Sequence, residues 1–190
     1  SAGQLRDSRD CLRAEKTRDA MHPFLFGPGR YRPYNTDMNQ SQYEALEEQI
    51  LDAFAALSHP VLRREGLRHT MRVIDMISLL HTDTPLWDRR TAALLHDTGK
   101  YLKNSPQHAR TSAILCEQLL PEESGIAEAI LHHSEKDRIH SPLAEDLKDA
   151  DVLARWLDDP NRYQHPRLVT ARNRLRAATI DSRRTEEQTD

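Results

Sequence analysis

The sequence predicts an all-α fold of six or seven helices, and three observations carry that prediction. Apolar residues recur every three or four positions from about residue 42 to residue 180, which is the helical period. Proline stands in the first turn of expected helices near residues 106 and 142, which is typical of helix entries. No useful length of chain alternates with the period of two that a half-buried strand requires. A core is therefore expected from about residue 42 to residue 157, with a C-terminal helix packed on it.

Each expected helix has its own boundary signals. In chain order the helices are expected at about residues 42–57, 61–80, 86–97, 105–120, 124–133, 142–157 and 166–180. Apolar stripes define the first two, and the third is almost wholly apolar before Gly99, which is expected to end it. Ser105 and Ser124 are expected as N-caps, because a serine hydroxyl accepts from a free backbone N–H. Pro121 is expected to end the fourth helix and Pro142 to open the sixth.

The two ends of the chain differ from this helical region. Residues 1–40 are charged in their first half and rich in Pro and Gly in their second half, which forbids a regular element there. Aromatic residues in this arm are compatible with contact to a protein surface and equally with a linker. Residues 181–190 are charged and expected to be disordered. The expected organisation is an N-terminal arm at 1–40, one domain at 41–180 and a disordered tail at 181–190.

Composition excludes several classes of protein. Of the 190 residues, 37% are hydrophobic and 30% are charged, and the net charge of −3 argues against a protein that coats nucleic acid. A membrane span and a signal peptide are not expected, because no apolar run is long enough. The two cysteines are too few for a disulfide framework, which predicts a cytoplasmic location, and Cys116 lies on an apolar stripe as a buried thiol.

Histidines and aspartates lie on apolar faces of the expected helices. His69 shares its stripe with Val73, and Asp151 follows Leu147 by four residues, so both are expected to face inward. His96 and Asp97 end an apolar helix, a pattern that by itself is more typical of an ordinary helix end than of a metal site. Buried imidazoles and carboxylates need partners, and donors of this kind suit a divalent transition metal.

Two further histidines follow the same logic. His108 shares its stripe with Leu115, and His133 shares its stripe with Ile130. His132 points in a more polar direction. We therefore expect His133 as a metal ligand and His132 as a substrate contact or an outer partner, and the sequence alone leaves the choice between them open.

The ordered set of these residues resembles the HD superfamily of metal-dependent phosphohydrolases. The segments that carry the resemblance are His69, LLHDTGK, QHARTSA, AILHHSE and KDADVL, over about residues 60–160. The order His…His-Asp…His…His…Asp is similar to the six-ligand form of the family. The resemblance implies an HD-domain-like helical bundle with two divalent transition-metal ions, Fe or Mn foremost, with Co, Ni or Mg also compatible.

The resemblance also implies a role for each residue. The first ion would be held by His69, His96, Asp97 and Asp151. The second ion would be held by Asp97, as a bridge, together with His108 and His133. A hydroxide bridging the two ions would attack phosphorus in line. Lys100 resembles the lysine of the family's HDxGK segment and would neutralise a phosphate oxygen, so Asp97 and Lys100 are the expected catalytic residues.

Contacts to a phosphorylated substrate are expected from polar side chains near the ligands. The candidates are Lys100, His132, Lys136 and Arg155, and Lys136 and Arg155 are equally compatible with ordinary surface charge. The basic residues of the last helix are Arg167, Arg172, Arg174 and Arg176. They predict a solvated face, with a surface for an anionic ligand or a partner as the alternative.

The leading functional prediction is metal-dependent hydrolysis of a phosphoester or phosphoanhydride bond in a small nucleotide or phosphorylated metabolite. The alternatives are a dinuclear-iron oxygenase on the same scaffold and a non-catalytic domain that binds a ligand or partner. The sequence lacks GxxxxGK[ST], GxGxxG and GxSxG motifs, so nucleotide binding by those loops and serine-hydrolase chemistry have no support. Substrate identity, native metal and oligomeric state stay open, and an oligomer is compatible with the sequence.

Overall fold

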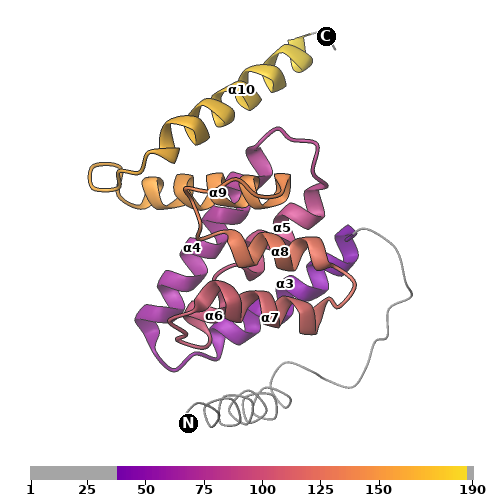
Figure 1. The fold of residues 1–190 in the computed structure, drawn as a ribbon, viewed down its shortest axis with the longest axis vertical. Coiled ribbons are helices and arrows are strands. Elements are labelled where there is room, and N and C mark those ends of the chain that lie inside the picture. The colour runs from indigo at the N-terminus through magenta and orange to yellow at the C-terminus, as the bar shows by residue number, and fades with distance from the viewer. Residues whose placement is uncertain (1–37, 188–190) are drawn as a thin grey trace, which may run out of the picture. The chain divides into compact units, whose positions relative to one another are not determined.

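The computed structural model of the chain describes residues 38–187, with side chains as far as residue 180. Over this range the fold is a helical bundle without strands, which confirms the predicted all-α class (Figure 1). The helices are α3 (Gln40–Ala55), α4 (Pro60–Leu79), α5 (Leu86–Leu95), α6 (Thr98–Tyr101), α7 (His108–Leu119), α8 (Ser124–His132), α9 (Pro142–Asp158) and α10 (Arg167–Glu187). The arm predicted at 1–40 lies almost wholly outside the described residues, and the division into arm, domain and tail stays a prediction.

Helices α4 and α9 pack against each other at the centre of the bundle (Figure 1). Every residue from 146 to 154 in α9 is buried, because α4, α5, α8 and α10 all contact this helix. The inward face of α4 carries Val73, Ile74 and Ile77, and α3 adds Ile50 and Phe54 to the same core. Each large apolar side chain buried in this way stabilises the fold by about 1.5–3 kcal/mol. The core therefore fixes the positions of the polar groups that these helices carry.

Side-chain capping explains where two of the central helices begin or end. Ser141 Oγ accepts from the Ala144 N–H at 3.4 Å, and proline follows in the first turn of α9. Arg89 donates to the carbonyl oxygens of Ile77 and Leu80 at 2.8 and 2.7 Å, at the end of α4. The buried guanidinium thus satisfies backbone acceptors that the helix leaves free.

Two predicted N-caps are wrong. Helix α7 begins at His108, and its N-cap position is Gln107, two residues after the predicted N-cap. Ser105 instead lies in the preceding turn, where its hydroxyl contacts the Thr111 hydroxyl at 2.8 Å. Helix α8 begins at Ser124 itself, and no side chain caps it.

The prediction that Gly99 ends a helix is wrong. Gly99 lies inside the short helix α6. A Cβ atom on Gly99 would lie 2.8 Å from Thr111 Cβ and 3.0 Å from Ser112 N, and closer still to the His108 carbonyl oxygen. The Gly99 N–H also donates to Ser112 Oγ at 2.8 Å. Glycine is required here because α7 packs directly on it, and this packing brings His108 next to Asp97.

Helix α10 continues to Glu187, beyond its predicted end at residue 180. Arg167 Nε lies 2.5 Å from Asp149 on α9, and Arg174 forms ion pairs with both Asp146 and Asp149. Both carboxylates are buried. The predicted solvated basic face is therefore wrong for Arg167 and Arg174, which neutralise charges inside the bundle, whereas Arg176 is exposed.

Candidate metal centre

Helices α4 to α9 bring six polar side chains to one place. His69 lies on the inner face of α4, His96 and Asp97 at the α5–α6 junction, His108 at the start of α7, His133 at the end of α8 and Asp151 in α9. These are the six side chains that the sequence resemblance implied as metal ligands. Five of them are buried, and the His108 side chain is 29% exposed, so the site opens to solvent on that side.

The carboxylate of Asp97 lies at the centre, and its two oxygens face different pairs of imidazoles. Oδ2 lies 3.6 Å from His69 Nε2 and 3.7 Å from His96 Nε2. Oδ1 lies 3.5 Å from His108 Nε2 and 3.6 Å from His133 Nε2. These distances exceed those of normal hydrogen bonds, and Oδ1 is a buried acceptor without a hydrogen-bond donor among the described residues. The donor set therefore fits a cation on each side of the carboxylate.

Hydrogen bonds to the backbone fix the tautomers of two imidazoles. His96 Nδ1 lies 2.7 Å from the carbonyl oxygen of Ala93, and His133 Nδ1 lies 2.6 Å from that of Ile130. Because a carbonyl oxygen only accepts, both Nδ1 atoms carry a proton, and in the neutral ring the Nε2 atom then presents a lone pair. His96 Nε2 also faces His69 Nε2 at 3.3 Å. Histidines that bind metal ions are oriented in this way, with the second ring nitrogen donating to a fixed acceptor.

The donors form two groups that share Asp97. The first comprises His69, His96 and Asp97, and the second comprises Asp97, His108 and His133. In each group the ligand atoms lie within 4.8 Å of one another. Asp151 adds a carboxylate oxygen 3.1 Å from His69 Nε2. Mixed imidazole and carboxylate donors suit divalent transition metals, so the side chains present fit such ions.

The charges in the site match what metal ligation requires. Burial lowers the pKa of His96 to about 3, so this imidazole is neutral at pH 7. Burial alone would raise the pKa of Asp97, but His96, His133 and Lys100 outweigh it and hold that pKa well below its ordinary value. The pKa of Asp151 is also held low against burial, with Lys136 as the largest opposing influence. Neutral imidazoles and ionised carboxylates are the forms that bind cations.

The four predicted substrate contacts lie in different surroundings. Lys100 Nζ lies 3.4 Å from Asp97 Oδ2, and Arg155 Nη2 lies 3.9 Å from the same oxygen. Their side chains are 39% and 37% exposed, so both border the site and solvent. Lys136 is 13% exposed and pairs with Asp151 at 2.7 Å. His132 contacts Glu135 at 3.0 Å and is not among the side chains that surround Asp97.

A third group of close donors, His132, Glu135 and His140, has a different character. His140 Nδ1 lies 2.6 Å from Lys148 Nζ. Because the lysine ammonium only donates, this Nδ1 accepts, and His140 Nε2 carries the proton toward Glu135 Oε2 at 3.4 Å. The His132 and His140 rings stack with centroids 4.1 Å apart. The group is therefore a hydrogen-bonded network that supports the α8–α9 loop, since the nitrogen available for a metal ion is already protonated.

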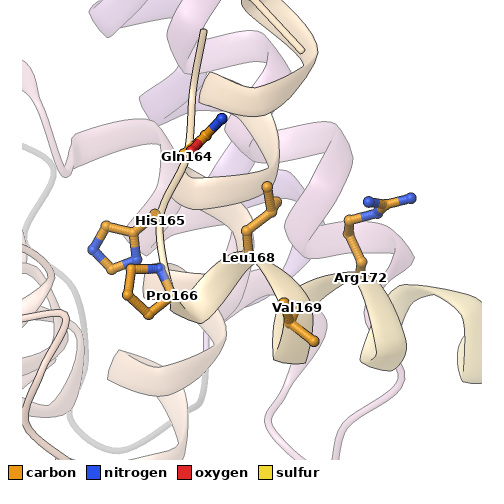
Figure 2. A pocket seen from close by; sticks show the side chains of 6 residues that line it. All are labelled: Gln164, His165, Pro166, Leu168, Val169 and Arg172. Atoms are coloured by element: carbon orange, nitrogen blue, oxygen red, sulfur yellow. The ribbon is translucent and has the colours of Figure 1, made fainter. Parts of the chain in front are cut away.

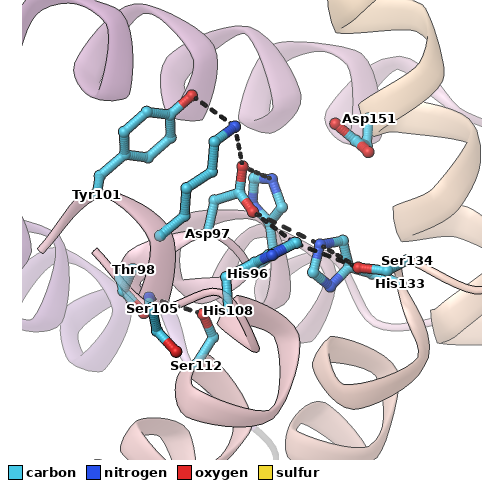
Figure 3. Close-up of polar contacts among 12 residues, drawn as sticks. His96, Asp97, Thr98, Tyr101, Ser105, His108, Ser112, His133, Ser134 and Asp151 are labelled. Atoms are coloured by element: carbon cyan, nitrogen blue, oxygen red, sulfur yellow. Dashed lines mark hydrogen bonds and ion pairs between the residues drawn. The ribbon is translucent and has the colours of Figure 1, made fainter. Parts of the chain in front are cut away.

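Two polar groups near the site were not predicted. Ser134 Oγ lies 3.3 Å from His108 Nε2 and 3.4 Å from His133 Nε2, and Figure 3 shows it beside His133. The Tyr101 hydroxyl lies 3.2 Å from Lys100 Nζ. Neither lies on an apolar stripe that a helical period marks. Their positions next to His133 and Lys100 in the chain were the available sequence signal.

A separate pocket lies at the start of α10 and has a volume of about 500 Å³ (Figure 2). Its lining residues are Gln164, His165, Pro166, Leu168, Val169 and Arg172. None of the six clustered side chains lines it, so the pocket is not part of the candidate metal centre.

Comparison with known protein families shows which family the residues around this site match. The model of the HD domain family matches residues 66–156, a range that contains all six clustered side chains. Residues 66–156 therefore match the HD domain family, as the resemblance in the sequence predicted. Most proteins with this domain are metal-dependent hydrolases. No curated protein and no solved structure matched the chain.

None of the described helices combines the length and the apolar character that crossing a membrane would require.

Proposed function

We propose that this chain is a metal-dependent phosphohydrolase that cleaves a phosphoester or phosphoanhydride bond in a small nucleotide or other phosphorylated metabolite. The observation that supports the proposal is the Asp97 carboxylate, whose two oxygens face two separate pairs of imidazoles. In this proposal the first ion is held by His69, His96, Asp97 and Asp151. The second ion is held by Asp97, His108 and His133. Fe²⁺ and Mn²⁺ are the ions that we expect to find.

The protein's own side chains have complementary tasks in this proposal. Divalent ions bound in the centre supply Lewis-acid polarisation of a phosphoryl oxygen and acidify water. Asp97 and Asp151 are ionised and offset the charge of the ions. Lys100 and Arg155 reach the solvent side of Asp97, where each binds a phosphate oxygen and stabilises the negative charge that builds up on it. The opening at His108 is the side from which substrate enters.

An anaerobic assay tests the proposal. The full chain is stripped with a chelator, reloaded with Mn²⁺ or Fe²⁺, and offered nucleoside mono-, di- and triphosphates, dinucleoside polyphosphates and sugar phosphates. We expect product formation that needs the metal and proceeds without oxygen, and that Asp97→Asn abolishes. Strict dependence on oxygen would identify an iron oxygenase instead. A protein that retains no metal and ignores EDTA would be a binding domain.

A further inference from the structure

The carboxylate of Asp151 is shared between the candidate metal centre and two basic side chains. Lys136 Nζ lies 2.7 Å from Asp151 Oδ2, and Arg155 Nε lies 2.9 Å from Oδ1. His69 Nε2 lies 3.1 Å from the same Oδ1. The Asp151 side chain is only 2% exposed, so these contacts take the place of water around a buried charge.

The loop between α8 and α9 holds Lys136 in this contact. Lys148, which is fully buried in α9, donates to the carbonyl oxygen of Arg138 at 2.9 Å and so ties the loop to the helix. The Lys136 side chain is 13% exposed, against 39% for Lys100. The Lys136 ammonium is therefore directed at Asp151, while Lys100 is the lysine presented to solvent.

We infer that Lys136 is a positioning residue of the first metal site and does not contact the substrate. Its ammonium holds Asp151 in place and is a counter-charge against which an incoming divalent cation competes. This inference rests on the proposed function, because it takes Asp151 as a ligand of the first ion. When Lys136 loses its charge, Arg155 still orients Asp151, and one repulsion between like charges is gone. A variant that lacks the charge of Lys136 therefore binds a divalent cation more tightly than the wild type.

Titration of the metal-free full chain with Mn²⁺ in a calorimeter, without substrate, tests this inference. Lys136→Met keeps most of the length of the side chain without its charge, and we expect an apparent Kd about tenfold lower than that of the wild type, equivalent to about 1.4 kcal/mol. Lys136→Gln is the second uncharged variant, because its amide still donates to Asp151. We expect the same gain in Mn²⁺ affinity from it, and it serves as the test if the methionine variant folds poorly. Lys136→Arg restores the charge and returns the Kd to within about twofold of the wild type. Lys103→Met, at an exposed lysine, is the matched control and leaves the Kd unchanged.

Binding of inorganic phosphate to the Mn²⁺-loaded chain distinguishes a lysine that positions Asp151 from a lysine that contacts the substrate. We expect Lys136→Met to bind phosphate as the wild type does, whereas a substrate contact would lose affinity. Any result in which neither uncharged variant binds Mn²⁺ more tightly overturns the inference, and weaker phosphate binding would make Lys136 a substrate contact. A wild-type chain that does not bind Mn²⁺ would overturn the proposed function itself.

Discussion

The contact between Gly99 and α7 provides a test of how the fold positions the metal centre. In Gly99→Ala the new Cβ would lie 2.8 Å from Thr111 Cβ and 3.0 Å from Ser112 N, with the His108 carbonyl oxygen nearer still. Ordinary van der Waals contacts begin at 3.4 Å. Two of the three atoms belong to the backbone and cannot rotate away. Helix α7 therefore has to move from α6 by more than about half an ångström, because the interior is close-packed.

This displacement has a cost in stability and a cost in function. Overpacking of a buried site lowers the free energy of unfolding by about 1–3 kcal/mol. For a chain of this size each kcal/mol corresponds to a fall of about 2–4 °C in Tm. His108 opens α7, so the same movement takes its imidazole away from Asp97. Displacements of this order slow catalysis about ten- to a hundredfold, and here the second ion should be lost before the first.

Thermal unfolding by circular dichroism and metal analysis of the purified protein measure the two effects. Gly125→Ala is the matched control, because a Cβ at Gly125 meets no atom within 4 Å. We expect this control to keep the wild-type Tm or to raise it slightly, since alanine favours the helix by about 1 kcal/mol over glycine. A Gly99→Ala protein with an unchanged Tm and full metal content would refute the argument that α7 is packed against this glycine.

Four further predictions concern single side chains. Asp97→Ala should lose both ions and all activity, because it removes the shared carboxylate, and metal analysis beside the activity assay checks this. His108→Ala should lose the second ion and keep a partly occupied first site, so equal loss of both ions would contradict the assignment of two sites. Lys100→Ala should keep its metal content but turn over more slowly, and loss of metal there would show a structural role for the lysine. Burial raises the pKa of the Cys116 thiol to about 12, so at pH 8 the thiol stays protonated and should resist iodoacetamide until urea unfolds the protein, as peptide mapping would show.

The helical period was sufficient to predict most of the elements and the inward direction of the key polar residues. His69 and Asp151 were expected to face inward because they share stripes with apolar neighbours, and both are buried. The same reasoning favoured His133 over His132, and the structure brings His133 and not His132 to Asp97. The period is sufficient here because the spacing from apolar neighbours on the same helix determines which face of that helix a residue lies on.

Features that depend on contacts between helices were not predictable in this way. The sequence predicts that Gly99 ends a helix, but the glycine is needed because α7 packs directly against it. Ser105 reads as an N-cap, but the turn that contains it places its hydroxyl against Thr111. Lys136 was expected as a substrate contact, with ordinary surface charge as the alternative, but the loop between α8 and α9 places it against Asp151. For Gly99 and Lys136 the neighbour that decides the role lies on another helix, whereas for Ser105 it lies six residues further on, in the helix that follows.

The burial of α9 shows why the folded unit has to extend beyond the residues that match the HD family. A helical stripe predicts one buried face, yet this helix is covered on several sides and buries Asp146, Asp149 and Asp151 together. A buried carboxylate that loses its cationic partner destabilises a protein by about 3–5 kcal/mol. Arg174 on α10 pairs with both Asp146 and Asp149, and Arg167 on the same helix also pairs with Asp149; both arginines lie outside the match at 66–156. Helix α10 thus neutralises the helix that presents Asp151 to the metal centre, and the structure that supports this site reaches at least to Arg174.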